Sequence, residues 1–244
     1  MPRPPRFFIS AEQVIGGNIT VSGEDVRHIA TVLRMKTGDE LVLCDGEGTE
    51  YAVTISQVDK SEVRTGIISR SKHDVRYPRL TLGQGLPKSD KMDFIVQKAT
   101  ELGVANLVPL ITERTIVKIR DEEKRVVRWQ KIAREAAMQS NRTDIPRVES
   151  IRRFSDFIQA PAPDPGTLLL LPWEEGTEPI KEALRTCPAA GNIMVLIGPE
   201  GGFSAAEAGM AKSRGFHLVS LGPNILRTET AAVATLSMIG YEFW

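Results

Sequence analysis

Two apolar segments in the C-terminal half of the chain each run into a Gly-Pro turn and then into a helical pattern, and this repeat constrains the fold most. Residues 193–197 (IMVLI) precede Gly198 and Pro199, and residues 218–221 (LVSL) precede Gly222 and Pro223. Short apolar runs that end at turn residues are typical of strands buried on both faces. Repeated strand, loop and helix favour a largely parallel sheet covered by helices, with both loops at the carboxyl edge, where such sheets bind ligands.

The same alternation of strands and helices extends back to about residue 79. Further strands are predicted at residues 80–83, 106–111 and 167–171, and helices at residues 89–102, 124–139, 204–214 and from about 230 to the end. Ser204 and Glu207 have the spacing of a capping box, in which each side chain bonds the backbone N–H of the other residue. Before the last helix, Thr228 has a plain interpretation as its N-cap, and Glu229 as a complement to its dipole.

Residues 1–75 have a different sequence pattern, in which short segments of alternating apolar and polar residues are separated by polar turns. Strands are expected at residues 41–44, 51–58 and 63–69, and one short helix at residues 22–35. This pattern favours a small β-barrel or sandwich. We therefore expect two domains, residues 1–75 and residues 76–244, with the boundary in the charged stretch near residues 72–79.

Charge and composition narrow the classes of function. The chain has 31 basic and 31 acidic residues, so nucleic-acid binding would need a local basic patch. Residues 114–134 supply one, although a solvated helix face is the plainer explanation of such a run taken alone. Its basic members are Arg114, Lys118, Arg120, Lys124, Arg125, Arg128, Lys131 and Arg134.

Cysteine and histidine usage argues against a metal site. The two cysteines lie far apart in sequence and are expected to be buried and reduced, although one disulfide would also fit. The three histidines are equally scattered, so zinc is not expected. No apolar run is long enough to span a bilayer, and we expect the protein in the cytoplasm.

The first glycine loop taken alone leaves two interpretations open. Residues 198–202 (GPEGG) lack the Gly-Lys-Ser/Thr ending of a P-loop and the G-x-G-x-x-G spacing of a Rossmann loop. They fit a tight strand-to-helix turn and a ligand site equally well, because glycine allows both unusual torsions and close approach of a ligand. The second Gly-Pro loop, at the next apolar strand, favours the ligand site.

The two loops together resemble a known family. The motifs GPEGGFS-x-x-E (198–207) and LG-x-x-ILRTETA (221–231) are similar to those of the ribosomal RNA small subunit methyltransferase E family. The similarity extends over nearly the whole chain, through residues 6–8, 28–34, 88–103, 113–117 and 136–142. It implies a SPOUT-type parallel sheet with a C-terminal trefoil knot, preceded by a PUA-like β-barrel. The implied reaction is methylation of N3 of a uridine in 16S rRNA of the small ribosomal subunit, by a homodimer that uses S-adenosylmethionine.

The resemblance also implies the residues of the site. Three loops, which follow residues 168–171, 193–197 and 218–221, would form the methyl-donor pocket. Its implied cofactor-binding residues are Leu171, Leu196, Gly198, Pro199, Glu200, Gly201, Leu221, Gly222, Asn224, Ile225, Leu226 and Thr228. The implied RNA-binding residues are Arg6, Arg27, His28, Arg34, Lys88, Arg114, Arg134, Gln139 and Arg142.

The chemistry of methyl transfer suggests three catalytic candidates. Transfer from a sulfonium is an in-line displacement, so correct placement of donor and acceptor can supply much of the catalysis. Uridine N3 carries a proton at neutral pH, and a base or stabilisation of the uridine anion would therefore help. Glu200 and Glu229 are the acidic candidates and Arg227 is the candidate stabiliser, although a turn, a helix dipole or an ion pair would also explain each.

Two segments depart from the family pattern. The family usually has Glu-Gln-Ser-Gly-Arg where this chain has Met138 to Arg142, and Arg where this chain has Asn224. Two other functions therefore stay open: the same chemistry at a different RNA position, and a non-catalytic RNA-binding or ribosome assembly factor. The complete GPEGG and ILRTETA loops favour the enzyme.

Overall fold

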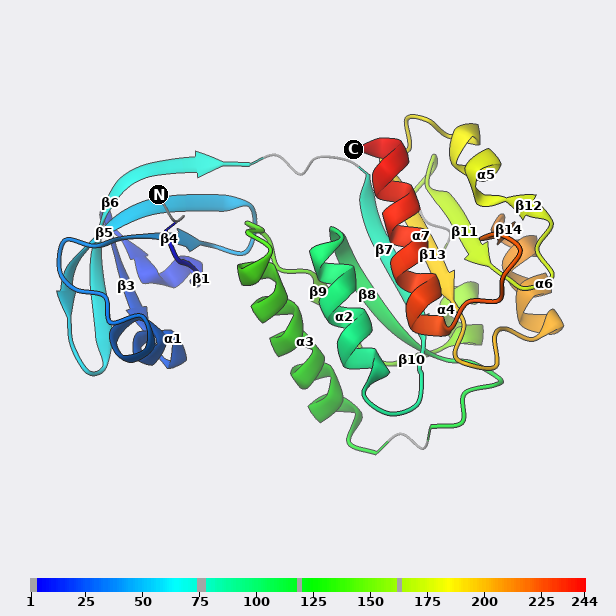
Figure 1. Ribbon diagram of the computed structural model, residues 1–244, viewed down its shortest axis with the longest axis horizontal. Helices are drawn as coiled ribbons and strands as arrows, with labels where there is room; N and C mark the ends of the chain where they lie inside the picture. The colour runs from blue at the N-terminus through cyan, green and yellow to red at the C-terminus, as the bar shows by residue number, and fades with distance from the viewer. Residues whose placement is uncertain (1–3, 74–77, 118–119, 162–163) are drawn as a thin grey trace. The chain divides into compact units, whose positions relative to one another are not determined.

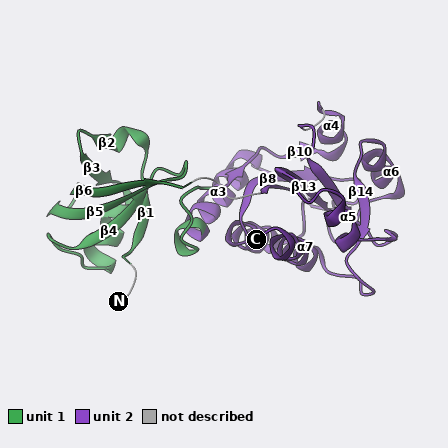
Figure 2. Ribbon diagram, turned by 90° about the horizontal axis from the view of Figure 1, so that it is seen from above, with its two compact units in different colours: residues 1–75, 137–145 green, residues 76–136, 146–244 purple. Residues whose placement is uncertain are grey.

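The computed structural model describes residues 4–73, 78–117, 120–161 and 164–244, and the chain divides into two compact units (Figure 2). Unit 1 comprises residues 1–75 and 137–145, and unit 2 comprises residues 76–136 and 146–244.

Unit 1 is a curled six-stranded sheet with the order β1-β4-β5-β6-β3-β2 (Figure 1). Its strands are β1 (Arg6–Phe8), β2 (Val14–Ile15), β3 (Asn18–Ser22), β4 (Glu40–Cys44), β5 (Thr49–Val58) and β6 (Glu62–Lys72). β1 is parallel to β4, and the other neighbours pair antiparallel. Alternate residues over most of β5 are buried, as expected of a strand with one face on a core. The three strands predicted in this region are confirmed, each slightly extended.

The helical part of unit 1 is shorter than predicted. It consists of η1 (Ala11–Gln13), α1 (Glu24–Arg27) and the π-helical turn η2 (His28–Val32), whereas the sequence predicted one helix at residues 22–35. Gly23 has φ of 80° and Arg34 has φ of 54°. Both values lie in the left-handed region, so a right-handed helix cannot pass through either residue.

Residues 137–145 belong to unit 1, although the sequence boundary assigned them to the second domain. Ala137, Met138 and Ile145 pack against Phe8 and Cys44. The backbone of this segment also bonds the 45–48 turn, with Gly48 N–H donating to Thr143 O at 3.2 Å. These contacts join residues about a hundred positions apart, and so local sequence patterns do not reveal them.

Unit 2 contains an eight-stranded sheet in which every pair is parallel. Its order is β10-β8-β7-β13-β11-β14-β12, and β9 pairs with β8. The strands are β7 (Arg79–Gly85), β8 (Val104–Ile111), β9 (Arg147–Val148), β10 (Arg152–Arg153), β11 (Leu168–Pro172), β12 (Glu178–Pro179), β13 (Asn192–Ile197) and β14 (His217–Ser220). The predicted parallel sheet covered by helices is confirmed.

Helices cover both faces of this sheet. They are α2 (Lys91–Glu101), α3 (Glu122–Gln139), α4 (Phe154–Gln159), α5 (Ile180–Thr186), α6 (Ala205–Ser213) and α7 (Thr228–Phe243). α2, α5 and α7 pack into one apolar cluster, and α4 and α6 into another. Within the described residues, no helix combines the length and the apolar character needed to cross a membrane.

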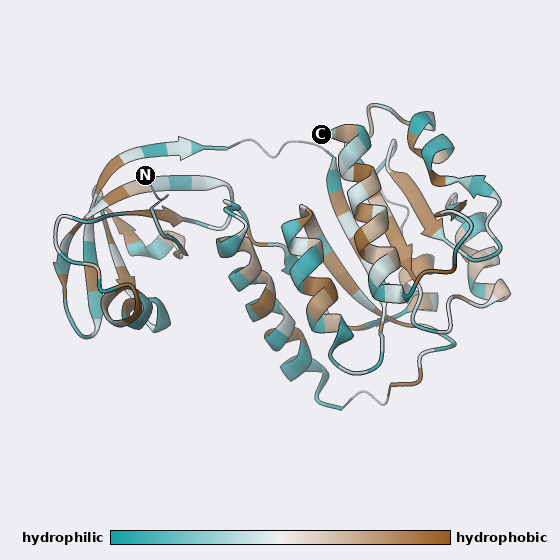
Figure 3. Cartoon of the chain, in the orientation of Figure 1, coloured by the Kyte–Doolittle hydropathy of each residue, from teal (hydrophilic) through white to brown (hydrophobic). Residues whose placement is uncertain are grey.

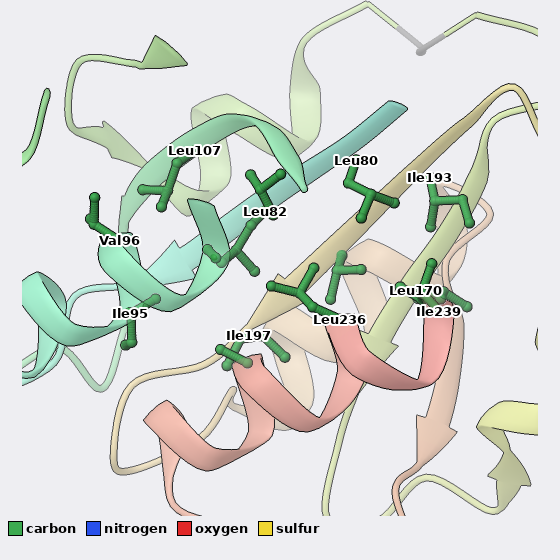
Figure 4. Close-up of a cluster of buried hydrophobic side chains, with 14 of the residues drawn as sticks. Leu80, Leu82, Ile95, Val96, Leu107, Leu170, Ile193, Ile197, Leu236 and Ile239 are labelled. Carbon is green, nitrogen blue, oxygen red and sulfur yellow. The ribbon is translucent and has the colours of Figure 1, made fainter. Parts of the chain in front are cut away.

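Burial on both faces explains the continuous apolar runs in the strands. Along β11, Leu168 and Leu170 belong to the cluster under α2 and α7, whereas Leu169 and Leu171 belong to the cluster under α4 and α6. Successive side chains of a strand point to opposite faces, so all four leucines are buried. Figure 3 shows the hydrophobic colour along the strands and α7. Figure 4 shows one cluster between the sheet and α7, to which Leu236 and Ile239 of α7 and Ile197 of β13 all belong.

The sequence predicted neither α4 and α5 nor the short strands β9, β10 and β12, and one predicted helix begins later than expected. α2 begins at Lys91 rather than at residue 89, because Ser89 has φ of 57° and cannot be helical. The strands β13 and β14 are not neighbours, since β11 lies between them. The two Gly-Pro loops nevertheless share the carboxyl edge, because all three strands are parallel. The trefoil knot that the resemblance implies stays a prediction.

Candidate functional site

A cavity of about 390 Å³ lies at the carboxyl edge of the central strands of unit 2. Its lining comes from the loops after β11, β13 and β14, together with Lys91 of α2 and Ala231 of α7. Residues 172–174, 197–200, 202–203 and 220–228 form these loops. The three segments that the sequence placed around one pocket therefore surround one cavity.

The loop after β13 is held in one conformation by close backbone packing. A Cβ on Gly198 would lie 2.9 Å from the carbonyl carbon of Gly202, so only glycine fits there. Gly202 has φ of 67°, and its N–H donates to Pro199 O at 2.9 Å. A Cβ on Gly85, at the end of β7, would come within 2.6 Å of Pro199. The loop is thus a rigid turn pressed against the neighbouring strand.

Helix α6 follows this loop and begins with the predicted capping box, which is confirmed. Glu207 N–H donates to Ser204 Oγ at 3.3 Å, and Ser204 N–H donates to Glu207 Oε2 at 3.0 Å. Glu207 is buried, and its second oxygen accepts from Glu113 N–H at 2.8 Å. One carboxylate therefore joins the start of α6 to the loop after β8.

Thr228 does not cap α7, contrary to the sequence interpretation. The N-cap is Arg227, and Thr228 is the first residue of the helix. The buried hydroxyl of Thr228 instead donates to Gly198 O at 2.6 Å and accepts from Gln84 Nε2 at 2.9 Å. The nearby Gly198 carbonyl provides a partner that local sequence could not reveal.

Three charged groups from three segments meet at the cavity. Lys91 Nζ lies 3.2 Å from Glu200 Oε1 and 3.3 Å from Glu229 Oε2. Glu200 also accepts from Lys88 N–H at 3.0 Å. Burial tends to raise the pKa of Glu200, but hydrogen bonds from its own N–H, from Lys88 N–H and from Lys91 outweigh burial and lower it. The hydrogen bond to Glu200, partly offset by desolvation, raises the pKa of Lys91, so Lys91 and Glu200 are both charged at neutral pH.

The third catalytic candidate is placed differently. Arg227 lines the cavity and is exposed, and its guanidinium has no hydrogen-bond or ion-pair partner among the described residues. An unpaired guanidinium beside a cavity can meet an anion that develops there. Glu200 and Glu229, by contrast, are occupied with Lys91.

Most of the implied cofactor-binding residues lie around the cavity. Those in the lining are Gly198, Pro199, Glu200, Leu221, Gly222, Asn224, Ile225, Leu226 and Thr228. Leu171 and Leu196 are instead fully buried in the cluster under α4 and α6, because strand alternation turns their side chains to that face. Gly201 lies outside the lining, and its carbonyl accepts from Arg114 Nη1 at 2.7 Å.

Sequence reasoning missed several lining residues. Lys91, Trp173, Glu174 and Phe203 line the cavity but were not among the nominated site residues, although Lys91 and Phe203 lie within segments that resemble the family. The strand before Trp173 was predicted, so its position just after a strand end was an available signal. Trp173 Nε1 is buried without a hydrogen-bond partner in the described part of the chain, and Glu174 lies 3.9 Å from Arg114.

The implied RNA-binding residues of unit 2 fall in two places. Lys88 and Arg114 belong to loops bonded to the turn after β13, through Glu200 and Gly201 respectively. Arg134 lies on α3 and is partly buried. The basic run that includes it is partly paired: Arg128 pairs with Asp93, and Lys124 lies 3.5 Å from Asp121. Lys118 lies outside the described residues.

The implied RNA-binding residues of unit 1 also differ in exposure. Arg27, His28 and Arg34 are exposed on and after α1, and the His28 ring packs edge-on against Phe7 at 5.5 Å. Gln139 is exposed at the end of α3. Arg6 pairs with Glu50 at 2.8 Å, and Arg142 pairs with Asp144 at 2.5 Å. The last two arginines are thus mostly engaged within unit 1.

The cysteines and acidic groups show no metal chemistry. Both cysteines are free thiols, and Cys187 is only partly buried, contrary to the expectation for it. Burial raises the pKa of the Cys44 thiol to about 11 against the opposing effect of Arg6, so it is not a reactive thiolate. Among the described residues, no group of three or more histidine, cysteine or acidic side chains could hold a metal ion.

Comparison with known proteins connects these features to characterised families. A family model described as an RNA methyltransferase domain matches residues 75–240, and one described as an RNA methyltransferase PUA domain matches residues 21–68. The ribosomal RNA small subunit methyltransferase E of Bacillus subtilis is 33% identical over 97% of this chain and 96% of its own length. That of Synechocystis is 32% identical over 96% of this chain and 76% of its own length. A crystal structure of this enzyme from Neisseria gonorrhoeae, bound to S-adenosyl methionine, matches with a TM-score of 0.88 at 30% identity over 98% of both chains.

Proposed function

The chain belongs to the ribosomal RNA small subunit methyltransferase E family, and on that premise we propose that it methylates N3 of a uridine in 16S rRNA with S-adenosylmethionine as donor. The observation that carries the proposal is the cavity between the GPEGG loop and the ILRTETA loop. A single cavity formed by both motifs is what a methyl-donor pocket requires.

The residues around the cavity fit a nucleoside-type donor. Its volume of about 390 Å³ lies within the roughly 300–1,000 Å³ of typical small-molecule pockets. The apolar side chains of Ile197, Leu221 and Leu226 can flank a ring, while the backbone groups of the loops can bond its polar edge. The side chain of Trp173 also lines the cavity.

The protein's contribution to methyl transfer is placement and charge. S-adenosylmethionine, when bound, supplies an electrophilic methyl group. The rigid loops around the cavity orient the reacting groups and exclude water. We propose that Arg227 stabilises the uridine anion at N3, because its guanidinium is unpaired within the described residues. Glu200 and Glu229 then act through charge at the rim, where both lie in ion-pair distance of Lys91.

We further propose that RNA contacts come from both units. In unit 2, Lys88 and Arg114 lie on loops bonded to the GPEGG turn, so phosphate contacts there would bring the RNA to the cavity. In unit 1, exposed Arg27, His28 and Arg34 form the basic surface of the PUA region. The enzyme would act on the small ribosomal subunit in the cytoplasm.

A homodimer is also part of the proposal. α7 carries apolar or small side chains on nearly every side, yet the large side chains of Tyr241 and Trp244 are 89% and 66% exposed. Phe94 on the adjacent α2 is 45% exposed. A helix that is apolar all round is expected to be covered on more than one face, and a second copy would cover this layer. Light scattering should give a dimer mass.

The decisive experiment combines donor binding with identification of the product. Purified protein is incubated with S-adenosylmethionine and small subunits from cells that lack this enzyme, and nucleosides are analysed by mass spectrometry. N3-methyluridine in 16S rRNA is the expected product. Methylation of another nucleoside would instead favour a different RNA position, and failure to bind the donor in calorimetry would favour a non-catalytic RNA-binding factor.

A matched pair of variants ties the activity to the cavity. Ala231 lines the cavity from α7, whereas Thr230, its neighbour, is exposed and outside the lining. Ala231→Phe should abolish donor binding by filling the cavity, and Thr230→Phe should not. Equal donor binding by both variants would show that this cavity is not the donor site.

A further inference from the structure

We propose that Gln84 is a positioning residue for the methyl donor, because it fixes, through Thr228, the gap between the two loops that bound the cavity. The inference rests on the proposed function for the identity of the ligand. Gln84 itself lies outside the cavity lining, so any effect it has on the donor must pass through another residue.

Gln84 stands at a polar position inside the apolar core of unit 2. It is the second-last residue of β7, pairs in register with Ile197 of β13, and is fully buried. Its amide Nε2 donates to Thr228 Oγ1 and to Gly85 O, both at 2.9 Å, and more weakly to Gly198 O at 3.5 Å. Its Oε1 has no hydrogen-bond partner within the described residues. An apolar side chain of similar size would fill this space without the cost of desolvating an amide.

The donors and acceptors of these hydrogen bonds follow one order, from β7 to α7 and from α7 to the loop after β13. The Gln84 amide donates to the Thr228 hydroxyl, which leaves that hydroxyl's proton free to be donated to Gly198 O at 2.6 Å. Thr228 lies within the ILRTETA motif and is the first residue of α7, and Gly198 is the first residue of the GPEGG loop.

The sheet itself does not connect these loops. β11 lies between β13 and β14, so the ladder hydrogen bonds of neither strand join one loop to the other. Gly198 and Thr228 both line the cavity, and the bond between them therefore sets its width at that point. The packing of Gly85 against Pro199 holds the same loop from the β7 side.

The test measures S-adenosylmethionine affinity by calorimetry and folding by thermal unfolding in four variants of the full chain. Thr228→Val keeps the shape and removes the hydroxyl, whereas Thr228→Ser keeps the hydroxyl. Gln84→Met keeps the length and removes the amide. Thr65→Val is the matched control, because Thr65 is an equally buried threonine whose hydroxyl donates to Ile19 O at 2.9 Å in unit 1.

Gln84→Met and Thr228→Val should each weaken donor affinity by about tenfold, the size expected for loss of one buried hydrogen bond. Thr228→Ser should recover most of that loss. Thr65→Val should lower the unfolding temperature without changing donor affinity, which separates positioning from general destabilisation. The double variant Gln84→Met with Thr228→Val should lose less affinity than the sum of the two single losses, because Gln84 acts mainly through Thr228 and its direct bond to Gly198 O is long, at 3.5 Å.

The outcomes distinguish this inference from the proposed function. If the unmodified protein binds no S-adenosylmethionine, the proposed function fails. If the unmodified protein binds it and Gln84→Met or Thr228→Val binds it equally well, the positioning role is wrong while the function stands. Additive losses of affinity in the double variant would also contradict the inference that Gln84 acts through Thr228. If Gln84→Met does not fold, the comparison of donor affinity between Thr228→Val and Thr228→Ser decides alone.

Discussion

The two sides of the cavity are held together by different kinds of interaction. On the buried wall (Gln84, Gly85, Gly198, Ser204, Glu207 and Thr228), side chains and backbone meet without solvent, at hydrogen-bond distances of 2.6 to 3.5 Å. On the charged rim (Lys91, Glu200, Arg227 and Glu229), ion pairs are partly exposed. Exposed ion pairs contribute about 0–1 kcal/mol, whereas breaking a buried hydrogen bond costs about 1–3 kcal/mol. The wall therefore sets geometry and the rim sets charge.

The largest loss of folding stability is expected at Gly85, where the wall is most closely packed. Gly85→Ala places a Cβ 2.6 Å from Pro199, including its backbone nitrogen, so the GPEGG loop must move. Overpacking of this kind typically costs about 1–3 kcal/mol, and we expect the upper end here because the contact is to backbone. Urea denaturation measures the loss, and donor affinity should fall with it.

Gly209→Ala is the control for that prediction. Gly209 lies in α6, is exposed, and a Cβ there meets nothing within 4 Å. Alanine should stabilise the helix by up to about 1 kcal/mol. If Gly85→Ala and Gly209→Ala change the free energy of unfolding equally, the wall is not close-packed. The contrast between a close-packed wall and a charged rim would then be wrong.

The second effect concerns the buried carboxylate of the wall. Glu207→Ala leaves the N–H groups of Ser204 and Glu113 without their acceptors, and we expect a loss of about 2 kcal/mol in the free energy of unfolding. Ser204→Ala removes only the N-cap acceptor and should cost about 1 kcal/mol. Chemical denaturation of both variants checks the order. A larger loss in Ser204→Ala would mean that the bond to Glu113 contributes nothing.

The parts of the fold set by local pattern could be predicted from the sequence. Continuous apolar runs predicted the strands, since burial on both faces leaves a one-dimensional signature. The capping box of Ser204 and Glu207 depends on a three-residue spacing and was equally accessible. The first residues of helices were harder to predict. The sequence pattern placed Ser89 in a helix, but its backbone lies in the left-handed region.

The parts of the site set by long-range contact could not be predicted. Thr228 bonds Gly198, 30 residues away, and Gln84, 144 residues away, so its local position suggested a cap instead. The insertion of β11 between β13 and β14 is likewise a property of the sheet. The placement of Leu196 was more accessible, because Ile197 lines the cavity and strand alternation turns its neighbour away.

On the rim, the largest effect should appear in catalysis rather than in stability. Arg227→Met removes the guanidinium that we propose to stabilise the uridine anion, and turnover should fall by about 100-fold. Arg227→Lys keeps the charge and should lose less. Single-turnover methylation of small subunits measures the rate. Because the Arg227 guanidinium makes no hydrogen bond or ion pair with any other described residue, an equally large loss of folding stability would contradict this assignment.

The smallest effect is expected for the ion pairs of Lys91, and its pH dependence identifies the cause. The net lowering of the pKa of Glu200 below 4.5 means that its ionisation stabilises the fold above that pH, and that this contribution is lost as pH falls through the lowered pKa. Lys91→Met removes part of that lowering, so the unfolding temperature should drop slightly at neutral pH. The gap from the unmodified protein should narrow in acid, as pH falls through the lowered pKa of Glu200 and protonation removes the charge that Lys91 bonds. Lys91→Arg, which keeps the charge, should show little gap at either pH. If the gap in Lys91→Met persists unchanged in acid, the rim is held by packing of the lysine stem, and the division between a geometric wall and an electrostatic rim is wrong.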